Sequence, residues 1–254
     1  MRRIKLLIAY DGTDFSGWQI QPKDETVVGL LQKTFQRVFG EEISILGASR
    51  TDAGVHALGQ VAVFRTRLLI DLDRMRCAWN AALPKSIFIR AAEIASDDFH
   101  PFHNVDAKTY YYHFFLARPL PHLARFGWNY QYINQVDFSK LSRCLSLFEG
   151  THDFGSFCTV ETGLPEETIR TIYSMKLHVM RRFGMGRIVV TGKAFARFMI
   201  RRMVGAAMDV ARRPEWTEET IAHMLANPNP RHELVKADGS GLCLRKIMYG
   251  PERV

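Results

Sequence analysis

Apolar runs of strand length and amphipathic segments of helix length follow one another in the same order in both halves of this chain. In the first half we expect strands at residues 4–10, 43–46, 60–64 and 87–91, and helices at residues 26–40 and 71–83. The order strand, helix, strand, strand, helix, strand is that of a ferredoxin-like unit. Such a unit packs two helices against one face of a sheet, so the pattern constrains the fold strongly.

Residue types at the helix ends support this assignment. Thr26 and Asp71 are typical N-cap residues, and Gly40 and Pro84 end the two periodic segments. In the second half we expect strands at residues 110–116, 173–179, 187–191 and 242–249, and helices at residues 138–148, 195–211 and 217–226. The predicted fold class is α+β, with two ferredoxin-like halves at residues 1–105 and 106–254.

The composition favours a soluble protein with a polyanionic partner. The net charge is +8 and the pI is near 9.5, and arginines are concentrated in the C-terminal third. A solvated basic face is the alternative, but the planar fork of arginine suits phosphate oxygens. No apolar run reaches the roughly 20 residues needed to span a bilayer, and the N-terminus is not typical of a signal peptide. We therefore expect a cytoplasmic protein without membrane contact.

Metal and disulfide chemistry are not indicated. The four cysteines form no C-x-x-C pair, and the nine histidines form no metal-binding spacing. Cys77 and Cys144 fall within amphipathic helical patterns and are interpreted as core residues. The sequence predicts no metal and no cofactor.

The segment Arg50-Thr51-Asp52-Ala53-Gly54-Val55-His56-Ala57 places a carboxylate between a cation and a glycine in a turn-rich region. Gly54 permits backbone dihedrals that help to aim a neighbouring side chain. Arg50 is expected to keep Asp52 ionised at neutral pH. An ionised and oriented carboxylate suits nucleophilic catalysis at a sugar carbon, although a surface turn with an ion pair is the common alternative.

This octet resembles the signature G-R-T-D-x-G-V-H-A of the TruA family of tRNA pseudouridine synthases. Other segments resemble that family in the same order along the chain: Tyr10-Asp11-Gly12-Thr13, Gly17-Trp18-Gln19, Thr26-Val27-Val28-Gly29, Leu58-Gly59-Gln60-Val61, Phe99-His100, Lys108-Thr109-Tyr110-Tyr111-Tyr112, Gly150-Thr151-His152-Asp153-Phe154 and Met199-Ile200-Arg201-Arg202-Met203-Val204-Gly205. The resemblance implies the pseudouridine synthase fold with a central cleft. It also implies isomerisation of uridine in the tRNA anticodon stem-loop, at positions 38 to 40 of the tRNA convention.

By this resemblance Asp52, Tyr110 and Arg201 are the catalytic residues, and base flipping brings the uridine to them. Arg50 and His56 support the loop or contact phosphate, and the substrate-binding set also includes Tyr112, Arg197 and Arg202. From the residues alone, the three tyrosines 110–112 are equally typical of an aromatic strand. Alternation along a strand allows only Tyr110 and Tyr112, or only Tyr111, to face the cleft. The arginines of the long helix are, in the same way, compatible with a solvated surface.

The chain departs from the family at several positions. Ser49 stands where the family usually has glycine, Phe102-His103 and Lys108-Thr109 replace arginine-containing segments, and residues 238–242 replace a proline-containing pattern. Each difference can shift which uridine or RNA is accepted. The alternative function is a non-catalytic RNA-binding module of two ferredoxin-like sheets, but the first half lacks the aromatic pattern of such platforms. A glycosidase or nucleosidase that uses Asp52 would need a second catalytic carboxylate, and the sequence offers no clear partner of this kind. The family pattern also implies a homodimer that binds one tRNA with both subunits.

Overall fold

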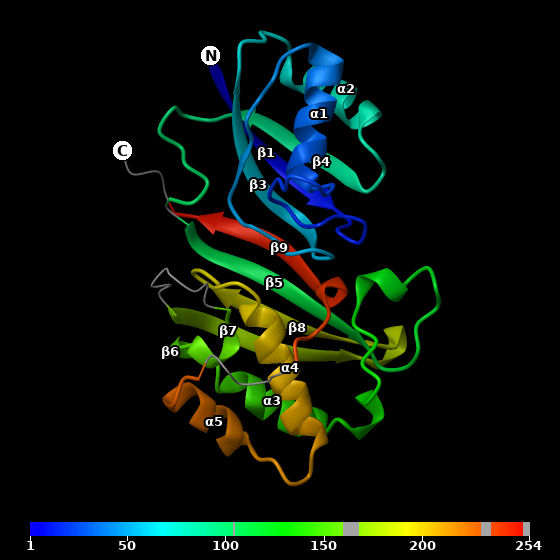
Figure 1. The fold of residues 1–254 in the computed structure, drawn as a ribbon, viewed down its shortest axis with the longest axis vertical. Helices are drawn as coiled ribbons and strands as arrows, with labels where there is room; N and C mark the ends of the chain where they lie inside the picture. Colours follow the sequence, from blue (N-terminus) through cyan, green and yellow to red (C-terminus); the bar gives the residue numbers. More distant parts are fainter. Residues whose placement is uncertain (104, 160–167, 230–234, 251–254) are drawn as a thin grey trace. The chain divides into compact units, whose positions relative to one another are not determined.

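The computed structural model describes residues 1–103, 105–159, 168–229 and 235–250. It divides the chain into two compact units. The first unit contains Met1–Asp106 and Cys243–Val254, and the second contains Ala107–Leu242. Each unit combines a sheet with helices, so the predicted α+β class is confirmed (Figure 1).

The first unit is built around a mainly antiparallel sheet. Its elements are β1 (Arg2–Tyr10), α1 (Val27–Phe39), β2 (Leu46–Gly47), β3 (His56–Thr66), α2 (Leu72–Ala82) and β4 (Ile87–Ile94). The strand order is β4-β1-β3, with β2 also paired to β3. Both the element order and the strand order are those of the predicted ferredoxin-like unit. The last strand, β9 (Leu242–Tyr249), has the predicted bounds, and it pairs in parallel with β3 at His56 and Ala57.

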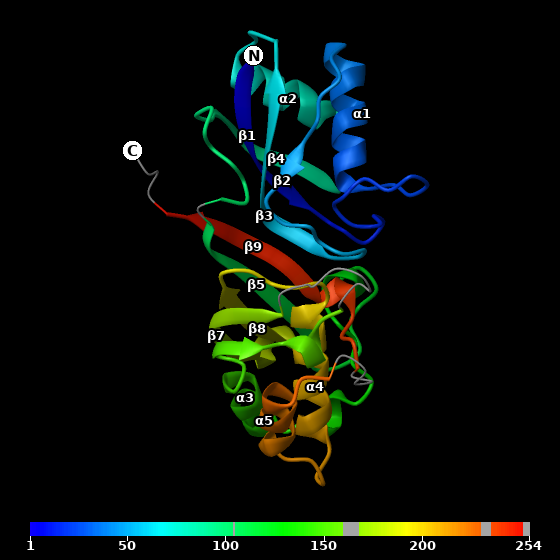
Figure 2. The ribbon, with the colours of Figure 1, turned by 60° about the vertical axis from the view of Figure 1, so that its left-hand side comes forward.

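Helices α1 and α2 lie on the same face of this sheet (Figure 2). The predicted caps are present, because the Thr26 side chain accepts a hydrogen bond from the amide of Gly29 and Asp71 accepts one from Arg74. Between helices and sheet, three aromatic rings pack edge to face: Phe35, Phe64 and Trp79 have ring centroids 4.7–5.6 Å apart. Edge-to-face packing of this kind stabilises a core beyond the area that it buries.

Cys77 corrects one sequence-based interpretation. Helix α2 buries Met75 and Trp79 against the sheet, and Cys77 lies between them in sequence. A residue two positions from each of two buried residues faces the opposite side of a helix, so Cys77 is exposed, whereas Cys144 is buried as expected.

Across the described residues, no helix has the length and apolarity to cross a bilayer.

The second unit has an antiparallel sheet in the order β5-β8-β7-β6. Its elements are β5 (Val105–Phe115), α3 (Phe138–Ser146), β6 (Gly150–Asp153), β7 (Ile169–Met180), β8 (Met185–Gly192), α4 (Met199–Arg212) and α5 (Glu218–Ala226). Strand β6 was not expected from the sequence, because four residues are too few for a clear alternation. The sheet buries alternate residues of β5 and β8, as a strand covered by helices on one face does.

Helix α4 begins later than the apolar pattern predicts. The sequence favoured a start at Phe195, but the helix starts at Met199, because Phe198 has a backbone φ of 61° in the left-handed region. That conformation cannot be part of a right-handed helix. From Met199 to Ala211 nearly the whole helix is buried, including the predicted apolar positions Met203 and Val204.

Candidate active site

Asp52 lies in the loop of residues 48–55, which joins β2 to β3 and which we call the Asp52 loop. The main chain of this loop is fixed on both sides of the carboxylate. The amide of Trp18 donates to the Thr51 carbonyl at 3.1 Å, and the amide of Gly54 donates to the Phe15 carbonyl at 3.3 Å. Asp52 itself is half-buried, and its carbonyl closes a turn by accepting from Val55. The loop therefore holds the Asp52 side chain in a defined place at the end of a core strand.

Two buried polar pairs fix the start of the loop. The Gln60 side chain is fully buried and bonds the main chain of Ser49 twice, with the Gln60 amide donating to the Ser49 carbonyl at 2.6 Å and the Ser49 amide donating to Gln60 at 3.2 Å. The hydroxyl groups of Tyr10 and Thr51 are 2.7 Å apart in a buried hydrogen bond. Satisfied buried polar groups of this kind define one backbone conformation, since any other leaves them unpaired.

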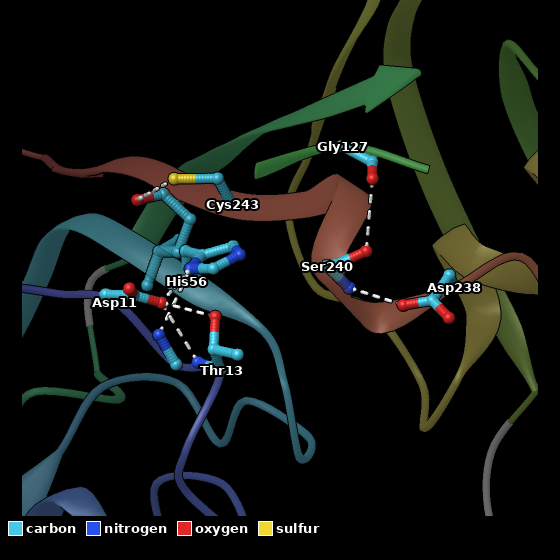
Figure 3. Close-up of polar contacts among 9 residues, drawn as sticks. Asp11, Thr13, His56, Gly127, Asp238, Ser240 and Cys243 are labelled. Atoms are coloured by element: carbon cyan, nitrogen blue, oxygen red, sulfur yellow. Dashed lines mark hydrogen bonds and ion pairs between the residues drawn. The ribbon is translucent and has the colours of Figure 1, made fainter. Parts of the chain in front are cut away.

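His56 supports the other end of the loop. It is 6% exposed, and its Nδ1 lies 3.1 Å from the amide of Gly12 and 3.2 Å from the Asp11 carboxylate. The same Asp11 oxygen accepts hydrogen bonds from the amide and the hydroxyl of Thr13 (Figure 3). The two roles expected for His56 were loop support and phosphate contact. This burial favours loop support, because little of the ring is left for RNA.

Gly12 lets the segment after β1 reach the Asp52 loop. A Cβ atom at this position would lie 2.0 Å from the Val55 carbonyl oxygen, which is far inside contact distance. Only glycine permits such an approach between two backbone segments. The Gly12 contact thus couples the segment of residues 10–18 to the loop that carries Asp52.

Arg50 is exposed at the edge of the Asp52 loop. The expectation that Arg50 keeps the Asp52 carboxylate ionised stays a prediction. An exposed arginine at the edge of the Asp52 loop is still available for phosphate contact.

The three consecutive tyrosines occupy both faces of β5, as alternation requires. Tyr110 is 5% exposed and packs edge to face against Phe195 with centroids 5.3 Å apart, whereas Tyr111 is half-buried and lies under the guanidinium of Arg187. Tyr112 is fully buried, and its hydroxyl donates to the Asp238 carbonyl at 2.9 Å. Burial raises the pKa of Tyr112 well above its ordinary value.

Tyr112 therefore differs from its predicted role. A ring with no exposed surface cannot stack on a base, so we assign Tyr112 to the core and not to substrate binding. Tyr110, two residues earlier on the same face of the strand, keeps a small exposed edge. The sequence pattern could not separate these two residues, because alternation places both on one face.

Arg201 and Arg202, in the first turn of α4, donate hydrogen bonds to main-chain carbonyl groups. Arg201 Nε donates to the Ala237 carbonyl at 2.8 Å, and the Ala237 amide donates back to the Arg201 carbonyl at 3.1 Å. Arg202 donates to the Cys158 carbonyl at 3.1 Å, and Arg197, just before the helix, is exposed. The guanidinium of Arg201 is thus oriented by its own neighbourhood, as a residue that must meet a reacting group requires.

Comparison with known proteins decides the family. A family model described as tRNA pseudouridine synthase matches residues 6–104 and 145–250. The chain belongs to the tRNA pseudouridine synthase family. A protein named tRNA pseudouridine synthase A from Maridesulfovibrio salexigens is 36% identical over 252 residues, which cover 98% of this chain and 91% of the relative.

Further relatives match over almost their whole length. The tRNA pseudouridine synthase A of Thermodesulfovibrio yellowstonii is 34% identical over 98% of this chain and 100% of its own. The tRNA pseudouridine synthase A 1 of Protochlamydia amoebophila is 36% identical over 99% of this chain and 98% of its own. The solved structure titled "Crystal Structure of a Cbf5-Nop10-Gar1 Complex" matches 80% of this chain and 54% of its own at 11% identity with a TM-score of 0.32, too low for an inference about fold.

Two of the positions at which this member of the tRNA pseudouridine synthase family departs from the family pattern have local explanations. Ser49 is 6% exposed and its main chain is bonded to Gln60, so the extra hydroxymethyl group is packed inside the unit. Asp238 replaces a proline-containing turn by accepting a hydrogen bond from the Ser240 amide at 2.8 Å (Figure 3). The Ser240 hydroxyl donates to the Gly127 carbonyl at 3.3 Å. A side-chain turn of this type shapes a backbone much as proline does.

Sequence reasoning missed three residues of the region around α4. Phe198 precedes the helix in a left-handed conformation, Lys236 lies with its ammonium 4.4 Å from the Phe198 ring centre, and Gly205 accepts the close approach of the Val235 carbonyl. A Cβ at Gly205 would lie 1.7 Å from that oxygen. Gly205 is part of the family-like segment and was visible in the sequence. For Phe198 and Lys236 no sequence pattern gives a signal, since their contact joins positions 38 residues apart.

Proposed function

We propose that this chain isomerises uridine to pseudouridine in tRNA, at positions 38 to 40 of the anticodon stem-loop, with Asp52 as the catalytic carboxylate. The observation that carries the proposal is the construction of the Asp52 loop. A half-buried carboxylate stands on a backbone that is fixed by main-chain bonds to Phe15 and Trp18. A group that must meet a reacting carbon repeatedly needs this kind of pre-organisation.

The reaction moves one bond within the nucleotide. The N1–C1′ bond of uridine breaks, the uracil rotates, a C5–C1′ bond forms, C5 loses its proton and N1 takes up a proton, so that the product is an isomer of the substrate and no electron is transferred. Asp52 assists the first step in one of three ways: it adds to C1′, it adds to the uracil ring, or it removes a proton from the sugar. In each of them the carboxylate must be ionised at the start.

Tyr110 and Arg201 complete the proposed catalytic set. The Tyr110 ring stacks on the detached uracil and keeps it in place between cleavage and reattachment, and its hydroxyl serves proton transfer at C5. Arg201 pairs with the Asp52 carboxylate and takes the space of the extruded base. Extrusion of a paired nucleotide costs a few kcal/mol, so a residue that fills the gap favours the flipped state.

The remaining assignments concern binding and assembly. Arg50, Arg197 and Arg202 contact phosphate groups, and His56 supports the loop. The half at residues 1–105 contributes the carboxylate, and the half at residues 106–254 contributes the tyrosine and the arginine. We also propose that the enzyme acts in the cytoplasm as a homodimer, since a single 29.1 kDa subunit is small for contact with both the anticodon arm and the elbow of a tRNA.

Tritium release tests the proposal. A tRNA with uridine at positions 38 to 40, labelled with tritium at C5, loses its label when C5 becomes bonded to the sugar. We expect one tritium released per modified uridine, and none from a tRNA with cytidine at those positions. Release from other uridines would assign the enzyme a different site on tRNA.

Two other outcomes separate the alternatives. If the protein binds the tRNA tightly but releases no tritium, it is an RNA-binding module without catalysis. If free uracil accumulates, the protein cleaves the glycosidic bond without reattachment, as a nucleosidase does. Mass-neutral modification together with tritium release is expected only of a pseudouridine synthase.

A further inference from the structure

Phe198 has an unusual backbone. Among the described residues it is the one non-glycine residue with positive φ, at 61°. Residues with a bulky side chain rarely adopt the left-handed region, where asparagine and aspartate are the usual non-glycine residues. The conformation sets the ring of Phe198 directly before α4, between the exposed Arg197 and the first turn of the helix.

Three cations surround the Phe198 ring. The Lys236 ammonium lies 4.4 Å from the ring centre, the Arg197 guanidinium 5.0 Å and the Arg201 guanidinium 5.4 Å. They come from three places in the chain: the residue before Phe198, the first turn of α4, and the segment after α5. We call these four residues the Phe198 cluster. Attraction between each cation and the ring electrons is a reason for all three to gather there.

The segment that carries Lys236 is itself tied to α4. The close approach at Gly205 seats the Val235 carbonyl on the helix, and the hydrogen bonds between Arg201 and Ala237 flank Lys236 on its other side. Lys236 is exposed, so its ammonium reaches the ring from a fixed backbone without being removed from solvent. The position of the third cation is therefore built by the fold and does not depend on a flexible segment.

The chemistry of the cluster suits a phosphate group. Two guanidinium forks and one ammonium around a single ring concentrate positive charge, while the ring prevents the cations from being dispersed. Guanidinium matches the geometry of two phosphate oxygens, and lysine adds a point charge. A phosphodiester of an RNA backbone offers these oxygens with little desolvation cost at a half-exposed site.

We propose that Phe198 is a positioning residue that gathers Arg197, Arg201 and Lys236 into a binding site for a backbone phosphate of the RNA substrate, and that Lys236 is a direct phosphate contact. The inference rests on the proposed function, because it takes tRNA as the ligand. It extends that function by adding a ring that acts through its neighbours and a cation outside the family-like segments.

Four variants of Phe198 separate the ring from the backbone. Phe198→Tyr and Phe198→Trp keep an aromatic ring. Phe198→Asn tolerates the left-handed conformation without a ring, and Phe198→Leu supplies neither. A second pair tests the lysine: Lys236→Ala removes a cation of the cluster, and Lys193→Ala removes an exposed lysine of the same unit that lies outside the cluster. Circular dichroism and thermal unfolding establish that each variant is folded.

The measurements are the Kd for tRNA from about 50 to about 200 mM KCl and the single-turnover rate at saturating tRNA. We expect Lys236→Ala to lower the salt slope by about one, with Lys193→Ala changing the slope by less. Phe198→Asn should weaken tRNA binding by about 10-fold and lower the salt slope by more than Lys236→Ala does. It should also slow the saturated rate, because Arg201 loses its contact with the ring. Phe198→Tyr keeps the ring, so its affinity, salt slope and rate should stay near the wild-type values.

Two results would overturn the inference that the Phe198 cluster binds a backbone phosphate. A folded Phe198→Asn protein with the wild-type slope and rate shows that the ring gathers no ligand-binding cations. Equal slopes for Lys236→Ala and Lys193→Ala show that Lys236 is an ordinary surface charge. The Kd and its salt slope are independent of the proposed catalysis, because tRNA binding is measured without turnover. Failure of the wild-type protein to release tritium refutes the isomerase proposal and leaves the binding result intact.

Discussion

The Asp52 loop and the Phe198 cluster place functional groups by opposite means. In the Asp52 loop, main-chain hydrogen bonds, the fully buried Gln60 and the contact at Gly12 define the backbone from several sides. In the Phe198 cluster, one ring and exposed or half-exposed cations define the arrangement. The first is rigid because alternatives leave buried groups unpaired, and the second is adjustable because its members remain in contact with water.

This difference matches what each region is proposed to do. The reaction rate falls steeply when a carboxylate that takes part in bond cleavage is displaced by about 1 Å. Its loop must therefore be held in place by several contacts. Cations that bind phosphate act at longer range and tolerate movement, since the interaction falls off gradually and is screened by salt. Substitutions in the loop should therefore act on rate, and those in the cluster mainly on affinity.

The largest expected effect is that of Asp52→Asn. The amide keeps the size of the side chain but removes its negative charge, so we expect the rate of pseudouridine formation to fall by roughly 10³-fold or more. The Kd for tRNA should change little, because the proposed contacts with the RNA phosphates are made by arginines and not by Asp52. Tritium release under single-turnover conditions measures the rate, and filter binding measures the Kd.

Asp24→Asn is the matched control, because it removes an exposed carboxylate from the same unit. It should leave both quantities at their wild-type values. A rate for Asp52→Asn within about 10-fold of the wild type would remove Asp52 from its catalytic role.

A pair of glycine substitutions compares the two regions directly. In both Gly12→Ala and Gly205→Ala the new Cβ overlaps a carbonyl oxygen, at 2.0 and 1.7 Å, so each should lower the free energy of unfolding by about 1–3 kcal/mol or more. Gly12→Ala should reduce the turnover rate through the Asp52 loop. Gly205→Ala should displace the Lys236 segment and weaken tRNA binding.

Thermal unfolding, single-turnover rates and Kd values check this pair. Gly184→Ala serves as the reference, because its Cβ meets no atom within 4 Å and adds only the strain of a φ of 61°. If Gly12→Ala and Gly205→Ala affected rate and affinity in equal proportion, the proposed division between the two regions would be wrong.

The sequence predicts features that depend on local signals, but not those that depend on contacts between distant segments. Helix caps at Thr26 and Asp71 and the order of elements along the first unit follow from local signals, since capping and periodicity depend on neighbours in sequence. The left-handed Phe198 and the exposed Cys77 do not. Their environments depend on which helix face is covered and on contacts between distant segments, and periodicity carries no information about either.

The candidate site shows the same limit. The sequence placed Asp52 and Arg201 in family-like segments, but spacing alone could not show how the residues around them are buried. It gave Tyr110 and Tyr112 similar surroundings, although only Tyr112 is sealed in the core by the Asp238 carbonyl. Residue type and spacing identify candidates, whereas burial and hydrogen-bond partners distinguish support from contact.

Gln60→Leu is expected to have a smaller effect on the loop. The leucine has a similar size but removes both hydrogen bonds from Gln60 to the main chain of Ser49, which costs about 1–3 kcal/mol of stability. The rate should fall because the start of the Asp52 loop is released, with little change in Kd. Gln36→Leu, which alters an exposed hydrogen bond to Glu42, is the control and should leave the rate unchanged. A normal rate in Gln60→Leu would mean that the remaining main-chain bonds are sufficient to hold the loop.

The smallest expected effect concerns Lys108 on β5, two residues before Tyr110. Burial lowers the pKa of Lys108 from 10.5 to about 8. Burial of the charged form therefore opposes folding below pH 8. Between pH 8 and 10.5 the unfolded chain binds more protons at this residue than the folded chain, so its contribution to stability rises with pH in that window. After a discount for partial exposure, Lys108→Met should stabilise the protein by about 1–2 kcal/mol at pH 7.

The pH dependence distinguishes this electrostatic cost from packing. If desolvation of the ammonium is the cause, the stability difference between Lys108→Met and the wild type should shrink from pH 8 upwards and become small by pH 10.5, where the lysine is neutral in the folded protein and half protonated in the unfolded chain. Urea unfolding at pH 7, 9 and 10.5 measures the difference, and the exposed Lys193→Met should show none at any pH. A difference that stays constant with pH would mean that the methionine packs better and that the lysine charge costs nothing. Either result places β5 in the comparison, because the Asp52 loop buries neutral polar groups, whereas β5 buries the greater part of a cation beside its proposed catalytic tyrosine.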